Sequence, residues 1–295
     1  SARALDWFLT PRSWPERTRA YIETASELFI DAATGALEAG GVRAADVDTV
    51  VFVSTTGIAT PSVEAVVHSR MGFRSDIERV PLFGLGCAGG VSGLAIASRL
   101  AQARPGSILL MVTVELTTLA FRLDRLDKAS VISAALFGDG AAACVLRAGK
   151  GGIATIEGAG EHLWPDTLDV MGWTIDPDGF GVLLRPDVPS FAAVNLKPAV
   201  ETILARIGVA SGDVDRFVFH PGGSKIVSAI ESGFALNQGS LVHERGVLAD
   251  HGNMSAPTVL FILQRTIADG LPKRTVLVAM GPGFTASAVS LVHAA

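Results

Sequence analysis

The feature that most constrains this chain is an internal repeat between its two halves. The segment DVDTVVFV at 46–53 corresponds to DVDRFVFH at 213–220, an offset of 167 residues. The segment SILL at 107–110 corresponds to RTVL at 274–277, again at an offset of 167. Any two α/β segments can share an order of elements, but a constant offset requires more than that. The repeat therefore predicts two copies of one structural unit.

Each half alternates helical and strand-like patterns, which predicts an α/β fold with one sheet per half. We assign residues 1–150 to the first half and 151–295 to the second. Expected helices are 21–39, 63–71, 88–103, 194–207, 224–234 and 256–267, and expected strands are 47–53, 82–86, 107–114, 141–146, 152–158, 214–219, 275–280 and 286–292. The second half opens with a strand, but no strand pattern precedes the first helix. We therefore expect the first half to lack its opening strand.

Composition narrows the class of protein. Apolar residues make up 49% of the chain and charged residues 18%, which excludes a disordered chain and predicts a sizeable core. The net charge is −5 without a basic cluster, so nucleic acid and anionic membranes are poor partners. No apolar run reaches the roughly 18 residues that a membrane span needs. Two cysteines cannot form a disulfide framework, so we expect a cytoplasmic location.

Cys87 is the strongest candidate for a catalytic nucleophile. It stands in GLGCAGG at 84–90, between a short expected strand and a long expected helix. Such a nucleophile elbow needs glycines for the sharp turn and for space beside the thiol. The N-terminus of the helix favours the thiolate. A buried structural cysteine is the alternative, and Cys144, inside an expected strand, is assigned to the core.

His220 is the candidate base. It follows an expected buried strand and precedes Pro221-Gly222-Gly223. Ligands bind at the carboxyl ends of strands in open α/β sheets. An imidazole there can accept the thiol proton and then polarise a thioester carbonyl. A hydrogen-bonded structural histidine is the alternative.

Asn253 is placed near these residues by the repeat, because it precedes its helix as Cys87 precedes the corresponding one, at an offset of 166. Its amide can donate to an oxyanion or an enolate, or it can cap the helix. The sequence has no Cys-x-x-Cys pair, no His-x-x-x-His pair and no glycine-rich dinucleotide motif after a strand. We therefore expect no metal, nicotinamide or flavin.

Five motifs make the chain resemble the type III polyketide synthases, the chalcone-synthase-like group of the thiolase-fold condensing enzymes. The resemblance runs from about Ala20 to Val292. The motifs are FGLGCAGG at 83–90, LFGDGAAA at 136–143, HPGG at 220–223, GNMS at 252–255 and GPGFT at 281–285, where Ala279-Met280 replaces the Gly-Phe that the family has. The resemblance implies a thiolase-like fold, with two duplicated α/β units in an αβαβα arrangement.

The same resemblance implies an iterative decarboxylative condensing enzyme. A starter acyl group passes from coenzyme A to Cys87. His220 maintains the thiolate, and with Asn253 it polarises the thioester and stabilises the enolate formed when malonyl-CoA loses CO2. The enolate attacks the acyl-cysteine, the cycle repeats, and the polyketide cyclises. The implied substrates are an acyl-CoA starter and malonyl-CoA, and no separate cofactor is implied.

Further positions match the family one by one. Phe137 matches the gatekeeping phenylalanine between the CoA tunnel and the cavity, with a core aromatic as the alternative. Residues that match positions lining the family's substrate cavity are Thr55, Thr56, Thr117, Ala120, Val182 and Ser255. Gly222, Gly223 and Lys225 match positions along which the pantetheine arm of coenzyme A passes in the family. A solvated lysine at a helix start is the alternative for Lys225. The C-terminal structural loop matches Gly281, Pro282 and Gly283.

The resemblance also bears on substrate size and assembly. Ala120 and Val182 stand where plant members often carry threonine and a second gatekeeping phenylalanine. Both changes enlarge the cavity, so we expect long or medium fatty acyl starters and alkylpyrone or alkylresorcinol products. A homodimer is expected, because Thr60-Pro61 matches the loop that reaches the partner's cavity. Family members carry an N-terminal segment with basic residues for the CoA phosphates, and no arginine near the start of this chain maps cleanly onto them.

Three other functions stay open. A ketoacyl carrier-protein synthase III shares the Cys-His-Asn set, but it carries His-Gln-Ala-Asn and Asn-Thr-Ser where this chain has HPGG at 220–223 and NMS at 253–255. A cysteine hydrolase would need a carboxylate-supported histidine after the nucleophile. A non-catalytic acyl-binding protein, or a truncated form unable to turn over, would retain the pocket without the reaction.

Overall fold

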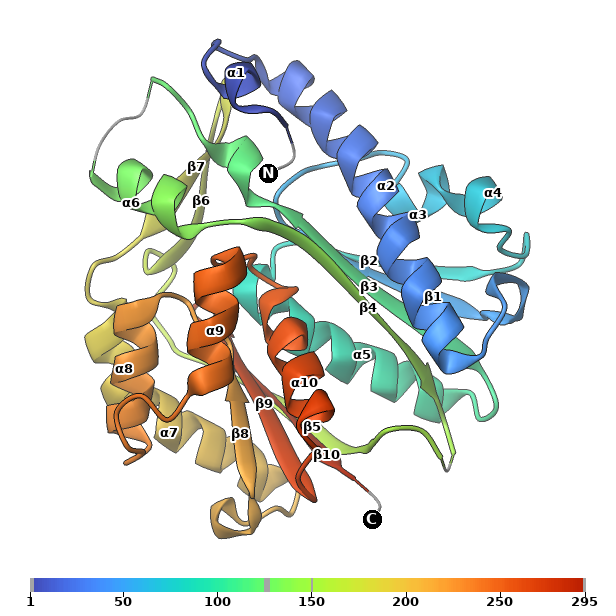
Figure 1. Cartoon of the computed structure of the whole chain (residues 1–295), viewed down its shortest axis with the longest axis vertical. Helices are drawn as coiled ribbons and strands as arrows, with labels where there is room; N and C mark the ends of the chain where they lie inside the picture. The colour runs from blue at the N-terminus through green and yellow to red at the C-terminus, as the bar shows by residue number, and fades with distance from the viewer. Residues whose placement is uncertain (1–2, 125–127, 150, 294–295) are drawn as a thin grey trace.

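The computed structural model describes residues 3–124, 128–149 and 151–293, which form two mixed β-sheets with helices outside and between them (Figure 1). The strand orders are β2-β1-β3-β4 and β5-β10-β9-β8. The first sheet contains β1 (Thr49–Val53), β2 (Glu78–Leu82), β3 (Ile108–Leu116) and β4 (Asp139–Arg147), and the second contains β5 (Thr155–Leu163), β8 (Arg216–Phe219), β9 (Arg274–Gly281) and β10 (Thr285–Val292). A separate hairpin pairs β6 (Met171–Asp176) with β7 (Gly179–Leu184).

The helices complete five layers, which confirms the predicted αβαβα arrangement (Figure 1). The helix α2 covers the outer face of the first sheet, α5 and α10 lie between the two sheets, and α7 and α8 cover the second. The α-helices are α1 (Leu5–Phe8), α2 (Trp14–Gly40), α3 (Val63–Val66), α4 (His68–Met71), α5 (Gly89–Ala103), α6 (Lys128–Leu136), α7 (Val188–Arg206), α8 (Ser224–Gly233), α9 (Val242–His251) and α10 (Thr258–Ala268). Short 3-10 helices are η1 (Ala44–Asp46), η2 (Gly86–Ala88), η3 (Thr117–Ala120) and η4 (Ser211–Asp213).

The internal repeat is visible in the strand pairing. In the first sheet β1 runs parallel to β3, which pairs antiparallel with β4. In the second sheet β8 runs parallel to β9, which pairs antiparallel with β10. The strand β5 flanks β10, whereas within the described residues β4 has no strand on its outer side. The expectation that the first half lacks a counterpart of β5 therefore holds for the described residues.

The two halves share one hydrophobic core rather than meeting at a polar linker. Val91 on α5 and Val259 on α10 pack in one buried cluster with Val53 from the first sheet and Val289 from the second. Lys150, the last residue of the first half in our assignment, lies outside the described residues, so the boundary at 150 and 151 stays a prediction.

Local chemistry explains where the elements begin and end. The helix α2 starts at a capping box, in which Ser13 and Glu16 bond each other's backbone and side chain, and it ends at Gly41 in the left-handed conformation. The expected strand at 82–86 is wrong: the strand is Glu78–Leu82, because Gly84 and Gly86 have φ of 89° and 50°. The expected helix at 63–71 is divided into α3 and α4.

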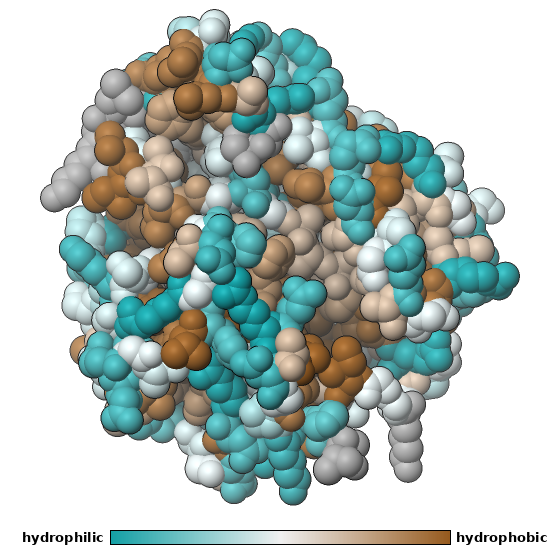
Figure 2. All heavy atoms as spheres, viewed as in Figure 1, coloured by the Kyte–Doolittle hydropathy of each residue, from teal (hydrophilic) through white to brown (hydrophobic). Residues whose placement is uncertain are grey.

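Five further helices and strands were not predicted: α1, α6, α9 and the two strands of the β6–β7 hairpin. Within the described residues, every helix is too short or too polar to span a membrane. Hydrophobic residues gather at the surface over α1 and α6 (Figure 2), where exposed side chains include Leu5, Leu9, Val131 and Ile132.

Candidate active site

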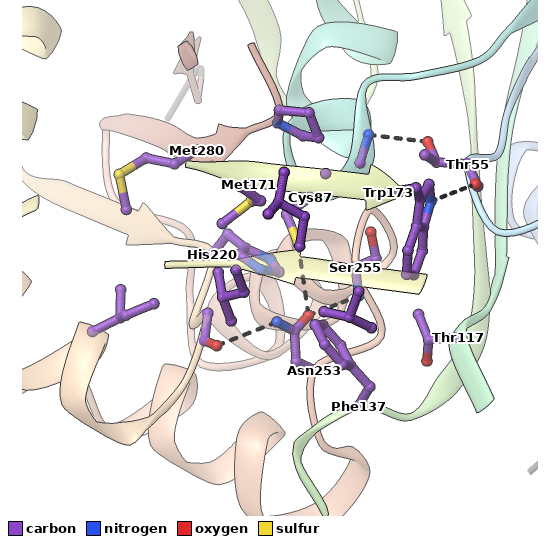
Figure 3. Close-up of a pocket in the computed structure, with 18 residues that line it drawn as sticks. Thr55, Cys87, Thr117, Phe137, Met171, Trp173, His220, Asn253, Ser255 and Met280 are labelled. Atoms are coloured by element: carbon purple, nitrogen blue, oxygen red, sulfur yellow. Dashed lines mark hydrogen bonds between the residues drawn. The ribbon is translucent and has the colours of Figure 1, made fainter. Parts of the chain in front are cut away.

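Cys87, His220 and Asn253 line one cavity at the junction of the two halves (Figure 3). Each comes from a different element: Cys87 from η2 before α5, His220 from the end of β8, and Asn253 from the turn after α9. The empty space of the cavity, counted together with open solvent at its mouth, is about 730 Å³. The predicted trio is thus brought together although its members are separated by 133 and 33 residues in the chain.

The thiol of Cys87 is enclosed, with 8% of the residue exposed. Its Sγ lies 3.9 Å from Asn253 Oδ1. Burial raises the pKa of Cys87 to about 11, although hydrogen bonds with Ser255 and Asn253 act in the opposite direction. Burial therefore outweighs these hydrogen bonds, and the thiol is neutral in the closed cavity.

The elbow before Cys87 is held by backbone contacts rather than by a strand. The N–H of Gly86 donates to Thr55 Oγ1 at 3.0 Å. A Cβ on Gly86 would lie 2.6 Å from Pro282 Cδ, so the turn needs glycine for both its φ and its packing. Pro282 in the C-terminal loop lines the cavity on this side.

The imidazole of His220 faces the cavity without a hydrogen-bond partner at either ring nitrogen among the described residues. Its backbone N–H donates to Val278 O at 2.8 Å, which continues the β8–β9 ladder by one residue. Burial lowers the pKa of His220 to about 3, so the ring is neutral at pH 7. A neutral imidazole can accept the proton of the neutral thiol next to it.

The carboxamide of Asn253 has a fixed orientation. Its Oδ1 accepts the Ser255 N–H at 2.8 Å, so Nδ2 is the donor, and it bonds Gly222 O at 3.3 Å. An amide nitrogen carries two hydrogens, so one is left for a substrate oxygen. The sequence offered a helix cap and an oxyanion donor as alternatives. Pro257 is the N-cap residue of α10 and no side chain caps that helix, so the helix-cap alternative is wrong, whereas the second N–H remains for an oxyanion.

Phe137 lines the cavity and is bound to Asn253 through the backbone. The N–H of Asn253 donates to Leu136 O at 2.8 Å, and the N–H of Gly138 donates to Asn253 O at 3.0 Å. A Cβ on Gly138 would lie 2.2 Å from His251 O, so only glycine allows this approach. The gatekeeper candidate and the amide are therefore placed by one short bridge between the halves.

A buried carboxyl that sequence analysis missed lies behind the cavity wall. Glu115 at the end of β3 is fully buried, and its Oε2 accepts the Thr55 N–H at 3.0 Å and two hydrogen bonds from Thr56. Its Oε1 has no partner among the described residues, and burial raises its pKa to about 7. Next to it, Tyr21 on α2 donates to Ser54 Oγ at 2.7 Å. The available signal was an acidic residue in the next-to-last position of the apolar run ILLMVTVEL.

Trp173 on β6 is the second residue that sequence analysis missed. Its indole lines the cavity, stacks on Phe180 with ring centroids 5.7 Å apart, and donates from Nε1 to Thr55 O at 2.9 Å (Figure 3). Arg122 bonds Asp176 at 2.6 Å and so fixes the end of the hairpin. The turn signal Asp-Pro-Asp-Gly at 176–179 could have revealed this hairpin.

The remaining predicted residues divide into two groups. Those that line the cavity with the trio are Thr55, Thr117, Phe137, Val182, Ser255, Gly222 and Pro282. Thr56 faces a second, smaller cavity beyond Thr55. Neither cavity is lined by Ala120, Gly223, Lys225, Gly281 or Gly283, and the side chain of Lys225 is exposed. Among the described residues, no three His, Cys, Asp or Glu side chains are grouped so that they could hold a metal ion.

Comparison with known proteins adds an independent observation. The model of the chalcone and stilbene synthases, N-terminal domain, matches residues 11–150, and that of their C-terminal domain matches residues 155–294. A 1,3,6,8-tetrahydroxynaphthalene synthase of Streptomyces peucetius subsp. caesius is 37% identical over 283 residues, which cover 92% of this chain and 74% of the relative. A putative chalcone synthase of Bacillus subtilis (strain 168) is 33% identical, covering 96% and 82%.

Solved structures agree with the sequence relatives. The crystal structure of 1,3,6,8-tetrahydroxynaphthalene synthase from Streptomyces coelicolor A3(2), a bacterial type III polyketide synthase, superposes with a TM-score of 0.94 at 28% identity. The superposition covers 99% of this chain and 85% of that one. Fold and sequence comparisons thus lead to the same family.

Proposed function

Because the chain belongs to the chalcone and stilbene synthase family of type III polyketide synthases, we propose that Cys87, His220 and Asn253 perform its condensing reaction. Members of this family are decarboxylative condensing acyltransferases that use coenzyme A thioesters and need no further cofactor. The observation that carries the assignment to this trio is their convergence in one cavity, with a free imidazole beside an enclosed thiol.

In the loading step, Cys87 attacks the thioester carbonyl of the starter. The thiol proton passes to His220, the new C–S bond to Cys87 forms, and the old C–S bond to coenzyme A breaks. The proton on His220 is then given to the departing CoA thiolate. The neutral states of both groups support this order, because proton transfer and attack take place together within the enclosed cavity.

In the extension step, malonyl-CoA loses CO2 and leaves an enolate on its thioester. His220 and the second N–H of Asn253 stabilise that oxygen, because both donors lie beside the thiol that carries the acyl group. The enolate carbon forms a bond to the acyl carbon while the bond to Cys87 breaks. Cys87 is thereby returned as a thiolate for the next cycle, and the finished chain cyclises.

The identity of the starter depends on the cavity wall. Val182 lines the cavity and is smaller than the phenylalanine that plant members carry at this position. The extra space supports the fatty acyl starter expected from the sequence and a pyrone or resorcinol product. Ala120 lines neither cavity, so it gives that prediction no support. The fatty acyl starter stays a prediction.

A second candidate is a short starter, with malonyl-CoA serving for both loading and extension. Trp173 favours a short starter, because its indole is held in the cavity by Phe180 and by the Thr55 carbonyl and takes up space that a long acyl chain would need. The relatives named as tetrahydroxynaphthalene and 3,5-dihydroxyphenylacetyl-CoA synthases are also named for aromatic products without an alkyl tail.

The discriminating experiment is mass spectrometry of products from the purified enzyme. It is supplied with malonyl-CoA alone, and then with malonyl-CoA plus a series of acyl-CoA starters from acetyl to palmitoyl. Products that carry the added acyl group support the fatty acyl starter. A product built only from malonyl carbons in every mixture supports the short starter.

The roles within the trio are tested by two substitutions. Cys87→Gln cannot carry an acyl group but leaves His220 and Asn253 in place, so it should lose condensation while malonyl-CoA decarboxylation continues. Cys87→Ala should likewise form no product. Radiolabelled malonyl-CoA measures CO2 release and product separately. Full product formation by Cys87→Ala would contradict the proposed reaction.

A homodimer is the remaining part of the proposal. Thr60-Pro61 is exposed, and the apolar side chains of Ile58 and Val66 nearby are each 44% exposed. Burial of such side chains against a second copy would remove apolar surface from water. The path of the pantetheine arm past Gly222, Gly223 and Lys225 and the cytoplasmic location stay predictions.

A further inference from the structure

His220 and Asn253 reach the cavity from two elements that are not joined by a β-ladder. His220 follows β8 directly, and Asn253 stands two residues after the end of α9. Beside β1, the counterpart of β8, lies β2, but within the described residues β8 has no strand on its outer edge. The side chain of Glu244, on α9, reaches that edge instead. The separation of the two side chains therefore depends on how α9 is fixed to β8, together with the backbone bridge from Asn253 to Leu136 and Gly138.

One buried side chain makes that connection. Glu244 on α9 is fully buried, and its Oε1 accepts the N–H of Phe219, the residue before His220, at 3.2 Å. Its carboxylate also accepts two hydrogen bonds from Arg216 Nη2, at 2.7 and 3.0 Å. Arg216 begins β8 and Phe219 ends it, so a single carboxylate holds both ends of this strand.

We propose that Glu244 is a positioning residue that sets the distance between His220 and Asn253 by fixing α9 to the outer edge of β8. The far end of the same arrangement is closed by the bond from Asn253 Nδ2 to Gly222 O. Two contacts therefore connect α9 and the residue after it to β8 and the loop that follows it. One is from Glu244 to β8, and the other is from Asn253 to Gly222. This inference rests on the proposed function, in which His220 and Asn253 stabilise one enolate together.

The chain contains a matched control. Glu231 on α8 is also fully buried, accepts the backbone N–H of Leu241 at 3.1 Å, and bonds one arginine, Arg245, at 2.6 Å. Leu241 and Arg245 both belong to the first turn of α9, so Glu231 holds that helix to α8 rather than to β8. Substituting Glu231 disturbs a buried pair of the same kind without acting on the strand that carries His220.

The experiment measures malonyl-CoA decarboxylation in the Cys87→Gln background, because that reaction needs His220 and Asn253 but no acyl-cysteine. Glu244→Asp withdraws the carboxylate by about 1.5 Å, one C–C bond. We expect kcat to fall roughly tenfold or more, since small misplacements of catalytic groups are costly, while KM for malonyl-CoA changes little. Glu231→Asp should keep kcat within about twofold. Near-ultraviolet circular dichroism confirms that each variant is folded.

Glu244→Gln provides a second, milder change. It keeps an acceptor for the Phe219 N–H but loses the charge opposite Arg216, so its kcat should lie between those of Glu244→Asp and the parent. Equal losses in the Glu231 and Glu244 variants would overturn the inference, and so would an unchanged kcat in both Glu244 variants. If His220→Ala in the same background still decarboxylated at the parent rate, the proposed function itself would fail, and the inference with it.

Discussion

At the scale of single residues, burial decides the protonation of the site. Cys87, His220 and Glu115 are all enclosed, and for each of them burial favours the neutral form. A neutral thiol beside a neutral imidazole resists alkylation and oxidation in the absence of substrate. Reactivity then depends on the arrival of a thioester, whose carbonyl accepts the electrons as the proton moves to His220.

Glu115 makes stability depend on pH. Its folded-state pKa of about 7 lies above the ordinary value of 4.5, so the folded protein prefers the protonated form. The stabilisation is complete below pH 4.5 and is lost as the pH rises to about 7, amounting to about 3 kcal/mol at about 1.4 kcal/mol per pKa unit. Glu115→Gln cannot ionise, and its Oε1 can accept the three bonds now made to Oε2.

The measurement for Glu115 is urea unfolding of both proteins at pH 5 and pH 8. The free energy of unfolding of Glu115→Gln relative to wild type should rise by up to about 3 kcal/mol between these pH values. Because the other titratable groups are common to both proteins, their contributions cancel in the difference. A difference that does not change with pH would contradict a raised pKa.

Trp173 should control the length of the acyl group that can be loaded. Trp173→Gly removes the indole from the cavity, so turnover with decanoyl-CoA or longer starters should increase relative to the wild type. Trp173→Phe keeps an aromatic ring but loses the bond to the Thr55 carbonyl, and it separates size from hydrogen bonding. Each enzyme is given malonyl-CoA together with an acyl-CoA starter. Mass spectrometry then gives the ratio of products that carry the acyl group to products built only from malonyl units. An unchanged ratio in Trp173→Gly would show that the indole does not limit the starter.

At the scale of elements, sequence patterns located those that carry local signals. The expected strands at 47–53, 107–114 and 275–280 overlap β1, β3 and β9, because fully buried strands are continuous apolar runs. The helix α9 was missed because its apolar residues form no clear stripe and Gly246 interrupts them. With α9 missed, Glu244 could not be placed beside β8, since that contact exists only after the helix packs.

Helix α5 should tolerate no side chain at Gly90, where it comes close to the backbone just before α10. A Cβ on Gly90 would lie 2.3 Å from Ala256 O, so Gly90→Ala should lower the free energy of unfolding by roughly 1–3 kcal/mol. Gly35 on α2 is the matched control, because a Cβ there meets no atom within 4 Å. Gly35→Ala should stabilise by roughly 0.5–1 kcal/mol. Denaturant unfolding measures both, and equal stability of wild type and Gly90→Ala would contradict the close crossing.

At the scale of the whole molecule, the repeat predicted the architecture because a constant offset requires equivalent strands. It also placed Cys87 and Asn253 at equivalent helix starts, which meet across the junction of the halves. The cavity wall was less predictable. Trp173 reaches the site only when the β6–β7 hairpin packs on the loop between β1 and α3, and Glu115 only when β3 packs on the same loop. No local sequence pattern predicts these contacts.

The expected homodimer is tested at this scale. Light scattering of the purified protein should give twice the chain mass. Val66→Asp places a charge near Thr60-Pro61 and should yield a monomer, because burying an unpaired carboxylate is costly. Val194→Asp is the control, since that valine on α7 is 71% exposed in the other half of the chain. A monomeric wild type would contradict the proposal.

The single tyrosine of the chain, Tyr21, provides an optical probe of the contact between α2 and the loop after β1. Tyr21 lines the smaller cavity next to Thr56 and donates to Ser54, and burial raises its pKa above the ordinary value of 10. Tyrosinate absorbs near 295 nm, so an alkaline titration of this protein contains one tyrosine signal and no background from others. Because the phenol is buried and bonded to Ser54, we expect it to ionise only when α2 moves away from the loop after β1, and the absorbance near 295 nm then reports that opening.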